Sequence, residues 1–303
     1  MIDFRLLVKK GVHFGHETSR WCPRMAPFIW GAKDNVHLID VSKTAVMLEK
    51  AAKFLEGVVS EGQTVLWIGT KKPAQEIMKE AAKLVDMPYV THRWIGGTLT
   101  NFGQVKKSLT RYLHFKDVLE KADRGHYTKK ELNSYSKLVA RLEKNIGGIL
   151  NLKWPVGALV VVDVRKERSA IKEAQTMGIP VIALVDTNCD PTGINHIIPG
   201  NDDAPHAIKV IIDYLAEAAQ RGKVVVDEKR DAEAALLGEK RAKAALDKAA
   251  LLKEEIDPLI AKAIAEGESE ESEGGSFASK KAAAGKKPAA RRPAGPPRRN
   301  DKR

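Results

Sequence analysis

Two stretches, Ala158-Leu-Val-Val-Val-Asp163 and Pro180-Val-Ile-Ala-Leu-Val-Asp186, decide the fold class of this 303-residue chain. Both are nearly unbroken runs of apolar and β-branched residues, which is the pattern of strands buried on both faces. The segment between them, residues 167–177, has helical spacing and ends before Gly178 and Pro180, which stop a helix. A strand, a helix and a second strand in this order predict a βαβ unit in a parallel sheet.

The same alternation is present nearer the amino terminus. Thr64-Val-Leu-Trp-Ile-Gly69 predicts another strand, and the residues that follow it predict a helix as far as about residue 85. Residues 89–92 predict a further short strand. Apolar residues 28–30 and 36–39 flank a polar turn, so they predict a β-hairpin. The whole pattern favours an α/β fold.

Residues 103–147 interrupt this alternation with two charged, helix-prone stretches, at about 104–121 and 128–145. They predict an antiparallel helical hairpin inserted into the sheet domain. We therefore expect a discontinuous α/β body (1–102 and 148–226), the hairpin (103–147), a helix-prone extension (227–265) and an acidic, then basic, tail (266–303). The tail is poor in apolar residues and rich in Gly, Pro and charge, so we expect it to be disordered.

Basic residues are concentrated in two parts of the chain. Residues 1–150 hold 25 basic and 15 acidic side chains, and residues 275–303 hold 10 basic and 1 acidic. This asymmetry indicates a polyanionic partner. No apolar run approaches the roughly 18 residues that a membrane helix needs, and the first residues lack the layout of a signal peptide. Cys22 and Cys189 lie far apart, so we expect a cytoplasmic protein without a disulfide framework.

Three segments are candidates for contact with RNA. Residues 11–25 are expected to form one loop, in which 11–16 and 20–25 mix His, Arg and aromatic residues. This mixture suits phosphate pairing and base stacking, although Phe14 and Trp21 can equally anchor the amino-terminal helix. Residues 92–102 combine Arg, Thr, Asn and paired Gly, and the alternative is a tight structural loop. Gly69-Thr-Lys-Lys72 joins a strand to a helix and lacks a Walker or dinucleotide-binding pattern, so it is either an ordinary turn or a phosphate contact. The predicted RNA-contact residues are Lys9, Lys10, His13, Arg20, Arg24, Lys71, Lys72, Arg93, Lys106 and Lys107.

Acidic residues follow several of the predicted strands, where open α/β sheets bind ligands. These are Asp163, Asp186, Asp190, Asp202 and Asp203. No nucleophile and base accompany them, so an enzyme site acting on a phosphorylated metabolite is only the alternative hypothesis. His16 together with Asp186, Asp202 and Asp203 predicts a structural zinc site, whereas carboxylates and water alone would suit magnesium. The simpler interpretation is that Asp202 or Asp203 caps the following helix.

Seven segments, in order, form a pattern that spans about residues 3–225. They are Gly11-Val-His-Phe-Gly-His16, Arg20-Trp-Cys-Pro-Arg-Met25, Val36-His-Leu-Ile-Asp40, Gly69-Thr-Lys-Lys72, Arg93-Trp-Ile-Gly-Gly-Thr-Leu-Thr-Asn-Phe102, Asp186-Thr-Asn-Cys-Asp-Pro191 and Ile198-Pro-Gly-Asn-Asp-Asp-Ala204. Together they resemble the bacterial small-subunit ribosomal protein S2 family. Cys22 stands where that family usually has Asn, and Pro73 where Gln is common.

The resemblance implies a three-layer, Rossmann-like or flavodoxin-like parallel sheet that carries a coiled-coil hairpin. It also implies a structural constituent of the small ribosomal subunit that acts in translation without enzymatic activity. The expected partners are small-subunit ribosomal RNA near the head–body junction and neighbouring ribosomal proteins, including ribosomal protein S1. Neither a membrane nor a small-molecule substrate is expected, and no cofactor is required.

Overall fold

The structure is a computed structural model that describes residues 2–121, 127–231 and 240–241. The chain divides into two compact units, Met1–Ala235 and Leu236–Arg303, and the fold described below is that of the first. The predictions of a disordered tail (266–303) and of most of the helix-prone extension (227–265) lie outside the described residues. None of the described helices combines the length and the apolarity that crossing a membrane would take.

A parallel five-stranded sheet organises the body. Its strands are β4 (Thr64–Ile68), β5 (Tyr89–Val90), β6 (Val156–Val162), β7 (Val181–Val185) and β8 (His196–Pro199), in the order β5-β4-β6-β7-β8. Every neighbouring pair is parallel, as the βαβ pattern predicted. All residues of β7 and nearly all of β6 are buried, which agrees with their unbroken apolar sequence.

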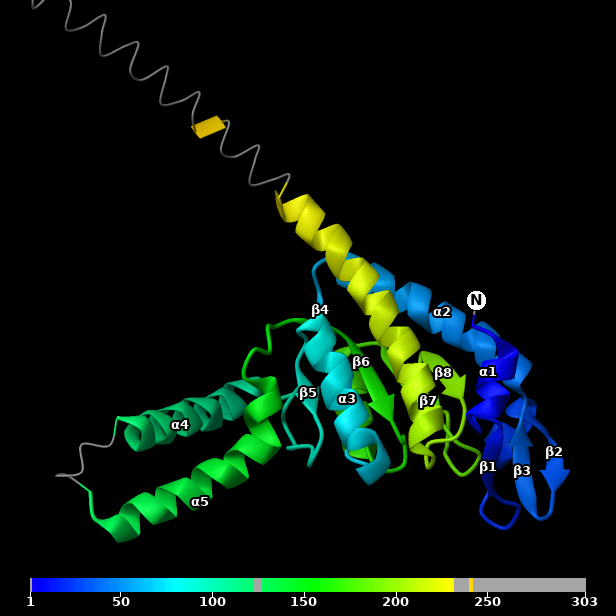
Figure 1. Cartoon of the computed structure of the whole chain (residues 1–303), viewed down its shortest axis with the longest axis horizontal. Helices are drawn as coiled ribbons and strands as arrows, with labels where there is room; N and C mark the ends of the chain where they lie inside the picture. Colours follow the sequence, from blue (N-terminus) through cyan, green and yellow to red (C-terminus); the bar gives the residue numbers. More distant parts are fainter. Residues whose placement is uncertain (1, 122–126, 232–239, 242–303) are drawn as a thin grey trace, which may run out of the picture. The chain divides into compact units, whose positions relative to one another are not determined.

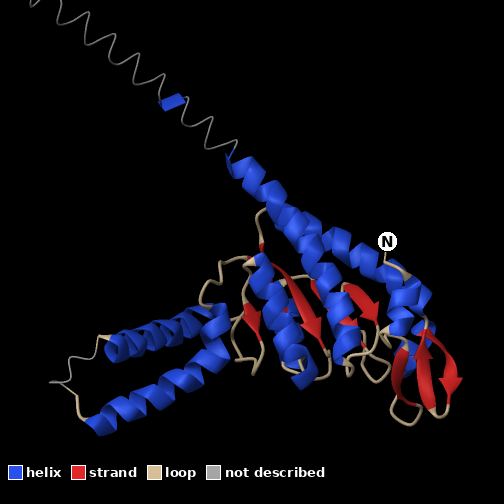
Figure 2. Ribbon diagram, viewed as in Figure 1, coloured by secondary structure: helices blue, strands red, loops and turns tan. Residues whose placement is uncertain are grey.

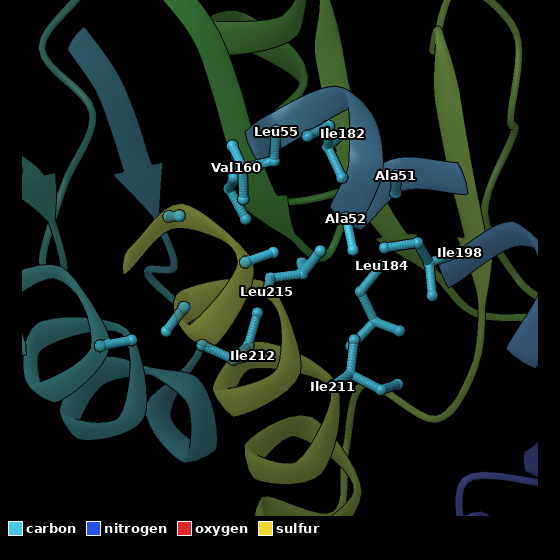
Figure 3. Packing of buried hydrophobic residues seen from close by; sticks show 14 of the residues in the cluster. Ala51, Ala52, Leu55, Val160, Ile182, Leu184, Ile198, Ile211, Ile212 and Leu215 are labelled. Atoms are coloured by element: carbon cyan, nitrogen blue, oxygen red, sulfur yellow. The ribbon is translucent and has the colours of Figure 1, made fainter. Parts of the chain in front are cut away.

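Helices cover both faces of this sheet, and Figures 1 and 2 show those on one of them. One face packs against α2 (Val41–Ser60), α3 (Lys72–Val85) and a helix of residues 205–231, and Figure 3 shows this core. The other face packs against α6 (Arg168–Met177) and the first turns of α4 (Phe102–Glu120). Successive residues of β4 alternate between the two cores, because side chains of a strand point to opposite faces. The architecture is therefore the expected mixed α/β fold with a Rossmann-like parallel sheet.

A small amino-terminal lobe precedes the body. It contains α1 (Phe4–Lys9), β1 (Phe14–Glu17), a 3-10 helix (Pro23–Phe28), β2 (Ile29–Lys33) and β3 (Val36–Ile39). The three strands form an antiparallel sheet in the order β1-β3-β2. The predicted hairpin is confirmed, and its turn residues Asp34 and Asn35 have left-handed φ values of 51° and 62°. The interpretation of residues 11–25 as one loop was wrong, since β1 gains strand partners that its own sequence does not reveal.

The charged segment forms two packed helices, α4 and α5 (Lys129–Ile146). Thr128 and Glu131 form a reciprocal capping box at the start of α5, and the rings of Phe115 and Tyr135 stack across the seam. Near the sheet, Val105, Leu109, Tyr112 and Ile146 are buried in the same cluster as residues of β4, β6 and β7. The base of this hairpin is thus part of the core, while its distal part packs mainly on itself.

A shortened hairpin is expected to fold, whereas complete removal is not. Deleting residues 104–146 removes Val105, Leu109 and Ile146, whose burial contributes roughly 5–9 kcal/mol in total at ~1.5–3 kcal/mol each, comparable with the whole stability of a domain. Replacing residues 116–134 with a short glycine-rich turn keeps those residues and the Phe115–Tyr135 stack. Chemical denaturation should show a cooperative transition for the shortened chain only. A cooperative transition of unchanged midpoint after deletion of 104–146 would contradict this assignment.

Candidate functional site

Charged side chains gather at the carboxyl edge of the five-stranded sheet. Lys71 follows β4, Asp163 follows β6, Asp186 follows β7, and Asp202 and Asp203 follow β8. Because the strands are parallel, their carboxyl ends lie at the same edge, where open α/β sheets bind ligands. We call these five residues, together with His16, the carboxyl-edge cluster.

Lys71 provides a positive charge within this cluster. Its Nζ lies 2.7 Å from Oδ1 of Asp202, 2.6 Å from Oδ1 of Asp203 and 4.0 Å from Oδ2 of Asp163. Burial by itself lowers the pKa of Lys71, but hydrogen bonds and charges from Asp202 and Asp203 outweigh it and raise that pKa. Burial, together with the charge of Asp186, raises the pKa of Asp202. Lys71 was predicted to contact an RNA phosphate. Its ammonium group is instead bound to carboxylates of the protein itself.

His16 connects the amino-terminal lobe to the same cluster. Its Nδ1 lies 3.1 Å from Oδ2 of Asp186, and its Nε2 lies 3.2 Å from Oδ2 of Asp203. An imidazole donates from both nitrogens only when it is protonated. The hydrogen bond with Asp186 is the largest of the effects that raise the pKa of His16, against the opposing effect of burial. His16 thus bridges β1 and the loops after β7 and β8, and the two carboxylates favour its protonated form.

Gly15 allows this bridge to form. The backbone N–H of His16 donates to Oγ1 of Thr187 at 2.9 Å, so β1 runs directly against the loop after β7. A Cβ atom at Gly15 would lie 2.6 Å from Cγ2 of Thr187 and 3.1 Å from the carbonyl oxygen of His37. A side chain at this position would therefore push the lobe away from the sheet, and the glycine is required by close approach.

The four residues predicted to bind a metal lie together. Ligand atoms of His16, Asp186, Asp202 and Asp203 are all within 4.8 Å of one another, and this donor set of nitrogen and carboxylate oxygen suits zinc. Lys71 nevertheless contacts two of those carboxylates. An ion and the Lys71 ammonium would compete for the same oxygens, so metal binding requires Lys71 to withdraw.

Asn201 orders the turn that leads into the helix of residues 205–231. Oδ1 of Asn201 accepts the backbone N–H groups of Asp203 at 2.8 Å and Ala204 at 3.2 Å. Within the described part of the chain, no helix N–H donates to the carboxylate of Asp202 or Asp203. The simpler interpretation of these two aspartates as caps is therefore wrong. Asn201 also donates from Nδ2 to the carbonyl oxygen of Gly11 at 3.1 Å, which adds a second link to the lobe.

The loop after β4 binds a carboxylate that belongs to the protein. Glu167, only 2% exposed, accepts the backbone N–H of Thr70 at 3.1 Å and also its hydroxyl group. Lys166 donates from Nζ to the carbonyl oxygen of Thr70 at 2.8 Å. A phosphate in this turn before α3 would need free backbone amides, and the amide of Thr70 is already bound to Glu167. This geometry disfavours the alternative of a phosphorylated metabolite bound at residues 69–72.

Residues 92–102 form a loop that is folded around Glu173 of α6. The carboxylate of Glu173 accepts Nε1–H of Trp94 at 2.9 Å and the backbone N–H groups of Gly97 at 2.9 Å and Leu99 at 3.0 Å. Burial alone would raise the pKa of Glu173, but these hydrogen bonds lower it. The structural interpretation of this loop is confirmed for Trp94, which is buried, whereas Arg93 is exposed. Glu173 carried no sequence signal for this role.

The ten predicted RNA-contact residues come from three regions, namely the amino-terminal lobe, the carboxyl-edge loops and α4. Exposed among them are Lys9, Arg20, Arg24, Lys72, Arg93, Lys106 and Lys107, while Lys10, His13 and Lys71 are half-buried. Arg24 donates from Nη1 to Asp190 at 2.5 Å and to Thr192 at 2.7 Å, which fixes the lobe against the loop after β7. Burial lowers the pKa of His13, so this side chain favours its neutral form.

The fold and this site define a basic α/β protein whose ligand-binding edge is occupied by its own side chains. A family model described as Ribosomal protein S2 matches residues 7–222. The small ribosomal subunit protein uS2 of Rhodopseudomonas palustris (strain BisA53) is 44% identical over 220 residues, which cover 73% of this chain and 67% of that relative. The chain belongs to the ribosomal protein S2 family. This is a family of structural, non-enzymatic constituents of the small ribosomal subunit that act in translation.

His16→Ala is expected to destabilise the protein more at pH 6 than at pH 8.5. The folded state raises the pKa of His16, so its stabilising contribution is fully present below the unfolded value of about 6.5 and is lost as the pH rises through the folded value. The loss in Tm should be about 2–4 °C larger at pH 6, the shift that roughly 1 kcal/mol produces at this size. Thermal unfolding at both pH values, with His206→Ala at an exposed position as the control, checks this. A larger loss at pH 8.5 would exclude the charged bridge.

Proposed function

We propose that this chain is a structural constituent of the small ribosomal subunit that binds ribosomal RNA near the head–body junction. Membership in the ribosomal protein S2 family over residues 7–222 is the observation that carries the proposal. The turn after β4 supports a scaffold role, because the Thr70 amide and the Lys71 ammonium, which could bind a metabolite phosphate there, are already paired with Glu167, Asp202 and Asp203. The protein works in the cytoplasm, on the ribosome.

Contact with RNA is assigned to exposed cations near the base of the hairpin. Arg93 lies in the loop before α4, and Lys106 and Lys107 lie on its second turn, all three exposed. The excess of 25 basic over 15 acidic residues in 1–150 provides the general attraction to RNA. Residues 103–147 act in this proposal as an inserted coiled-coil arm whose charged outer face meets neighbouring components of the subunit.

The wild-type chain is expected to co-sediment with small subunits through a high-salt gradient, and failure to do so would refute the proposed function. The triple variant Arg93→Ala, Lys106→Ala, Lys107→Ala should lower the slope of log affinity for ribosomal RNA against log salt by about 2, or ~0.7 for each lost contact with a single strand. A control triple variant, Lys50→Ala, Lys53→Ala, Lys209→Ala, should keep the wild-type slope. Equal slopes for both triple variants would contradict this assignment of the contacts.

Ribosomal protein S1 is proposed to dock on the amino-terminal lobe. Large apolar side chains are exposed there in unusual number, with Trp30 at 76%, Phe14 at 49% and Val8 at 47%. Trp30 and Val8 line a hollow of about 320 Å³ that is also bounded by Leu38. Grouped apolar exposure of this kind marks protein interfaces. On the described part of the hairpin, only Leu113 and Tyr127 are large, apolar and exposed, so the lobe is favoured over the hairpin for this contact.

The double variant Phe14→Ala, Trp30→Ala is expected to weaken S1 binding to small subunits by about thirtyfold, since losing an aromatic anchor costs roughly 2 kcal/mol or more. Leu84→Ala, which also removes an exposed apolar side chain but lies on α3, should leave S1 binding unchanged. Titration of purified S1 onto subunits that carry each variant measures the effect. Unaltered binding to the double variant would exclude the lobe as the docking surface.

The carboxyl-edge cluster is proposed to take a structural divalent cation, zinc in preference to magnesium, when Lys71 withdraws. Lys71→Met is expected to bind zinc at least tenfold more tightly than the wild-type chain, because the competing ammonium is gone. Metal analysis after dialysis of the RNA-free protein measures this, and a chelator should lower the Tm of the loaded variant. The double variant Lys71→Met, His16→Ala is the control without the nitrogen ligand. Less than one zinc or magnesium per chain in both the wild type and Lys71→Met would contradict the metal site. Lys71 would then be the cation that neutralises these carboxylates in the wild-type protein.

A further inference from the structure

A cavity of about 660 Å³ opens between α6 and the loop after β7, beside the carboxyl ends of β6 and β7. Its cationic side chains are Arg24, Arg165, Arg168 and Lys172. Ile171, which is 4% exposed, gives it an apolar floor. The cavity adjoins the carboxyl-edge cluster at Cys189, whose Sγ lies within 4.8 Å of carboxylate oxygens of Asp163 and Asp202. Of the RNA contacts predicted from sequence, Arg24 alone lines the cavity.

The charges around this cavity are not balanced. Its only acidic lining residue, Asp190, accepts hydrogen bonds from Arg24 at 2.5 Å and from the Thr192 hydroxyl at 2.6 Å, and these contacts lower the pKa of Asp190 to about 2. Asp190 is thus already neutralised by Arg24. Among the residues that the structure describes, Arg165, Arg168 and Lys172 form no ion pair. Three cations around one concavity create a positive potential that favours an anionic ligand.

The cavity wall is held in place by the fold. Arg168, Ile171, Lys172 and Gln175 are spaced by three or four residues along α6, so they lie on one face of the helix. In the preceding loop, Oδ1 of Asp163 accepts the backbone N–H of Arg165 at 3.0 Å. On the opposite side, Oδ1 of Asp190 accepts the backbone N–H of Thr192 at 3.0 Å. A ligand would therefore meet a prepared set of charges, which lowers the entropy cost of binding.

We infer that this cavity binds one unstacked nucleotide of the subunit's RNA, with its phosphate group on Arg165, Arg168 and Lys172. Guanidinium groups bind phosphate oxygens in pairs, and an arginine plane can also stack on a base. The cavity is larger than a phosphate alone requires, and Ile171 with Val164 offers an apolar surface for a sugar or a base. This inference rests on the proposed function, since it specifies a nucleotide of the ribosomal RNA that the protein is proposed to bind.

The net charge of the surrounding segment does not predict this basic cavity. Residues 151–230 hold 10 basic and 11 acidic side chains, which predicts no attraction to RNA for that part of the chain. Folding separates these charges. Asp163, Asp186, Asp202 and Asp203 are directed to the carboxyl-edge cluster, and Glu167 and Glu173 bind neighbouring loops. Among the described residues, Arg165, Arg168 and Lys172 therefore face the cavity without an ion-pair partner.

The test compares the full-length double variant Arg168→Ala, Lys172→Ala with the control pair Lys50→Ala, Lys53→Ala on α2, which covers the opposite face of the sheet. All four side chains are exposed, and alanine is compatible with a helix, so both variants should fold. Affinity for small-subunit ribosomal RNA is measured over a series of salt concentrations. The slope should fall by about 1.4 for the cavity pair, from ~0.7 for each contact with a single strand, and stay at the wild-type value for the control.

A second readout locates the nucleotide directly. A photoreactive benzoylphenylalanine in place of Gln175, at the cavity wall, should cross-link to a ribosomal RNA nucleotide in assembled subunits. Equal slopes for the cavity and control pairs, or cross-links to protein alone, would overturn the inference. Saturable binding of adenosine monophosphate to the RNA-free chain, with an unchanged RNA slope, would assign the cavity to a free nucleotide and also overturn it. If wild-type protein itself fails to bind RNA, the proposed function fails instead, so the two failures are distinguishable.

Discussion

The burial of the parallel sheet on both faces is the constraint on which the rest of the structure depends. All of β7 and nearly all of β6 are inaccessible to solvent, so neither strand can carry charged groups along its length. Polar side chains are therefore confined to the strand ends. Because all strands run in the same direction, Lys71, Asp163, Asp186 and Asp202 are delivered to one edge. Several carboxylates at one partly buried edge need a positive charge, and Lys71 and His16 provide it.

The protein's own groups occupy the positions that an enzyme with this fold would leave open. Glu167 accepts a hydrogen bond from the backbone amide of Thr70, and Glu173 accepts hydrogen bonds from the loop around Trp94. Each carboxylate holds a loop against α6. At these positions the fold serves as a scaffold, which agrees with membership in a family of structural ribosomal proteins. Glu173 holds the loop that leads into the hairpin, and His16 holds the amino-terminal lobe against the loops after β7 and β8.

The proposed interaction surfaces consist of charged and apolar side chains that the fold does not use in its own contacts. The acidic residues of the second half of the body are used within the fold, so Arg165, Arg168 and Lys172 remain on a cavity although their segment has no net positive charge. The apolar residues of α1 and β2 that do not fit into the core, Trp30 above all, stay exposed on the lobe. Charge and hydrophobicity summed along the chain thus describe the surface poorly, because folding sorts residues by face and not by sequence position.

The sequence by itself determined the strands β4, β6 and β7, the two helices of the hairpin and the family, because apolar periodicity and short motifs are local properties. The sequence also predicted aspartates at the ends of strands, and it grouped His16 with them in a predicted metal site. Only the tertiary structure decided that Lys71 lies among those aspartates, that Asn201 orders the turn before the last helix of the body, and that Glu173 closes the loop around Trp94. These contacts join residues 70 or more positions apart or choose between adjacent side chains. These contacts depend on strand register and on the close approach of β1 to the loop after β7 that Gly15 permits. A local sequence pattern predicts neither of them.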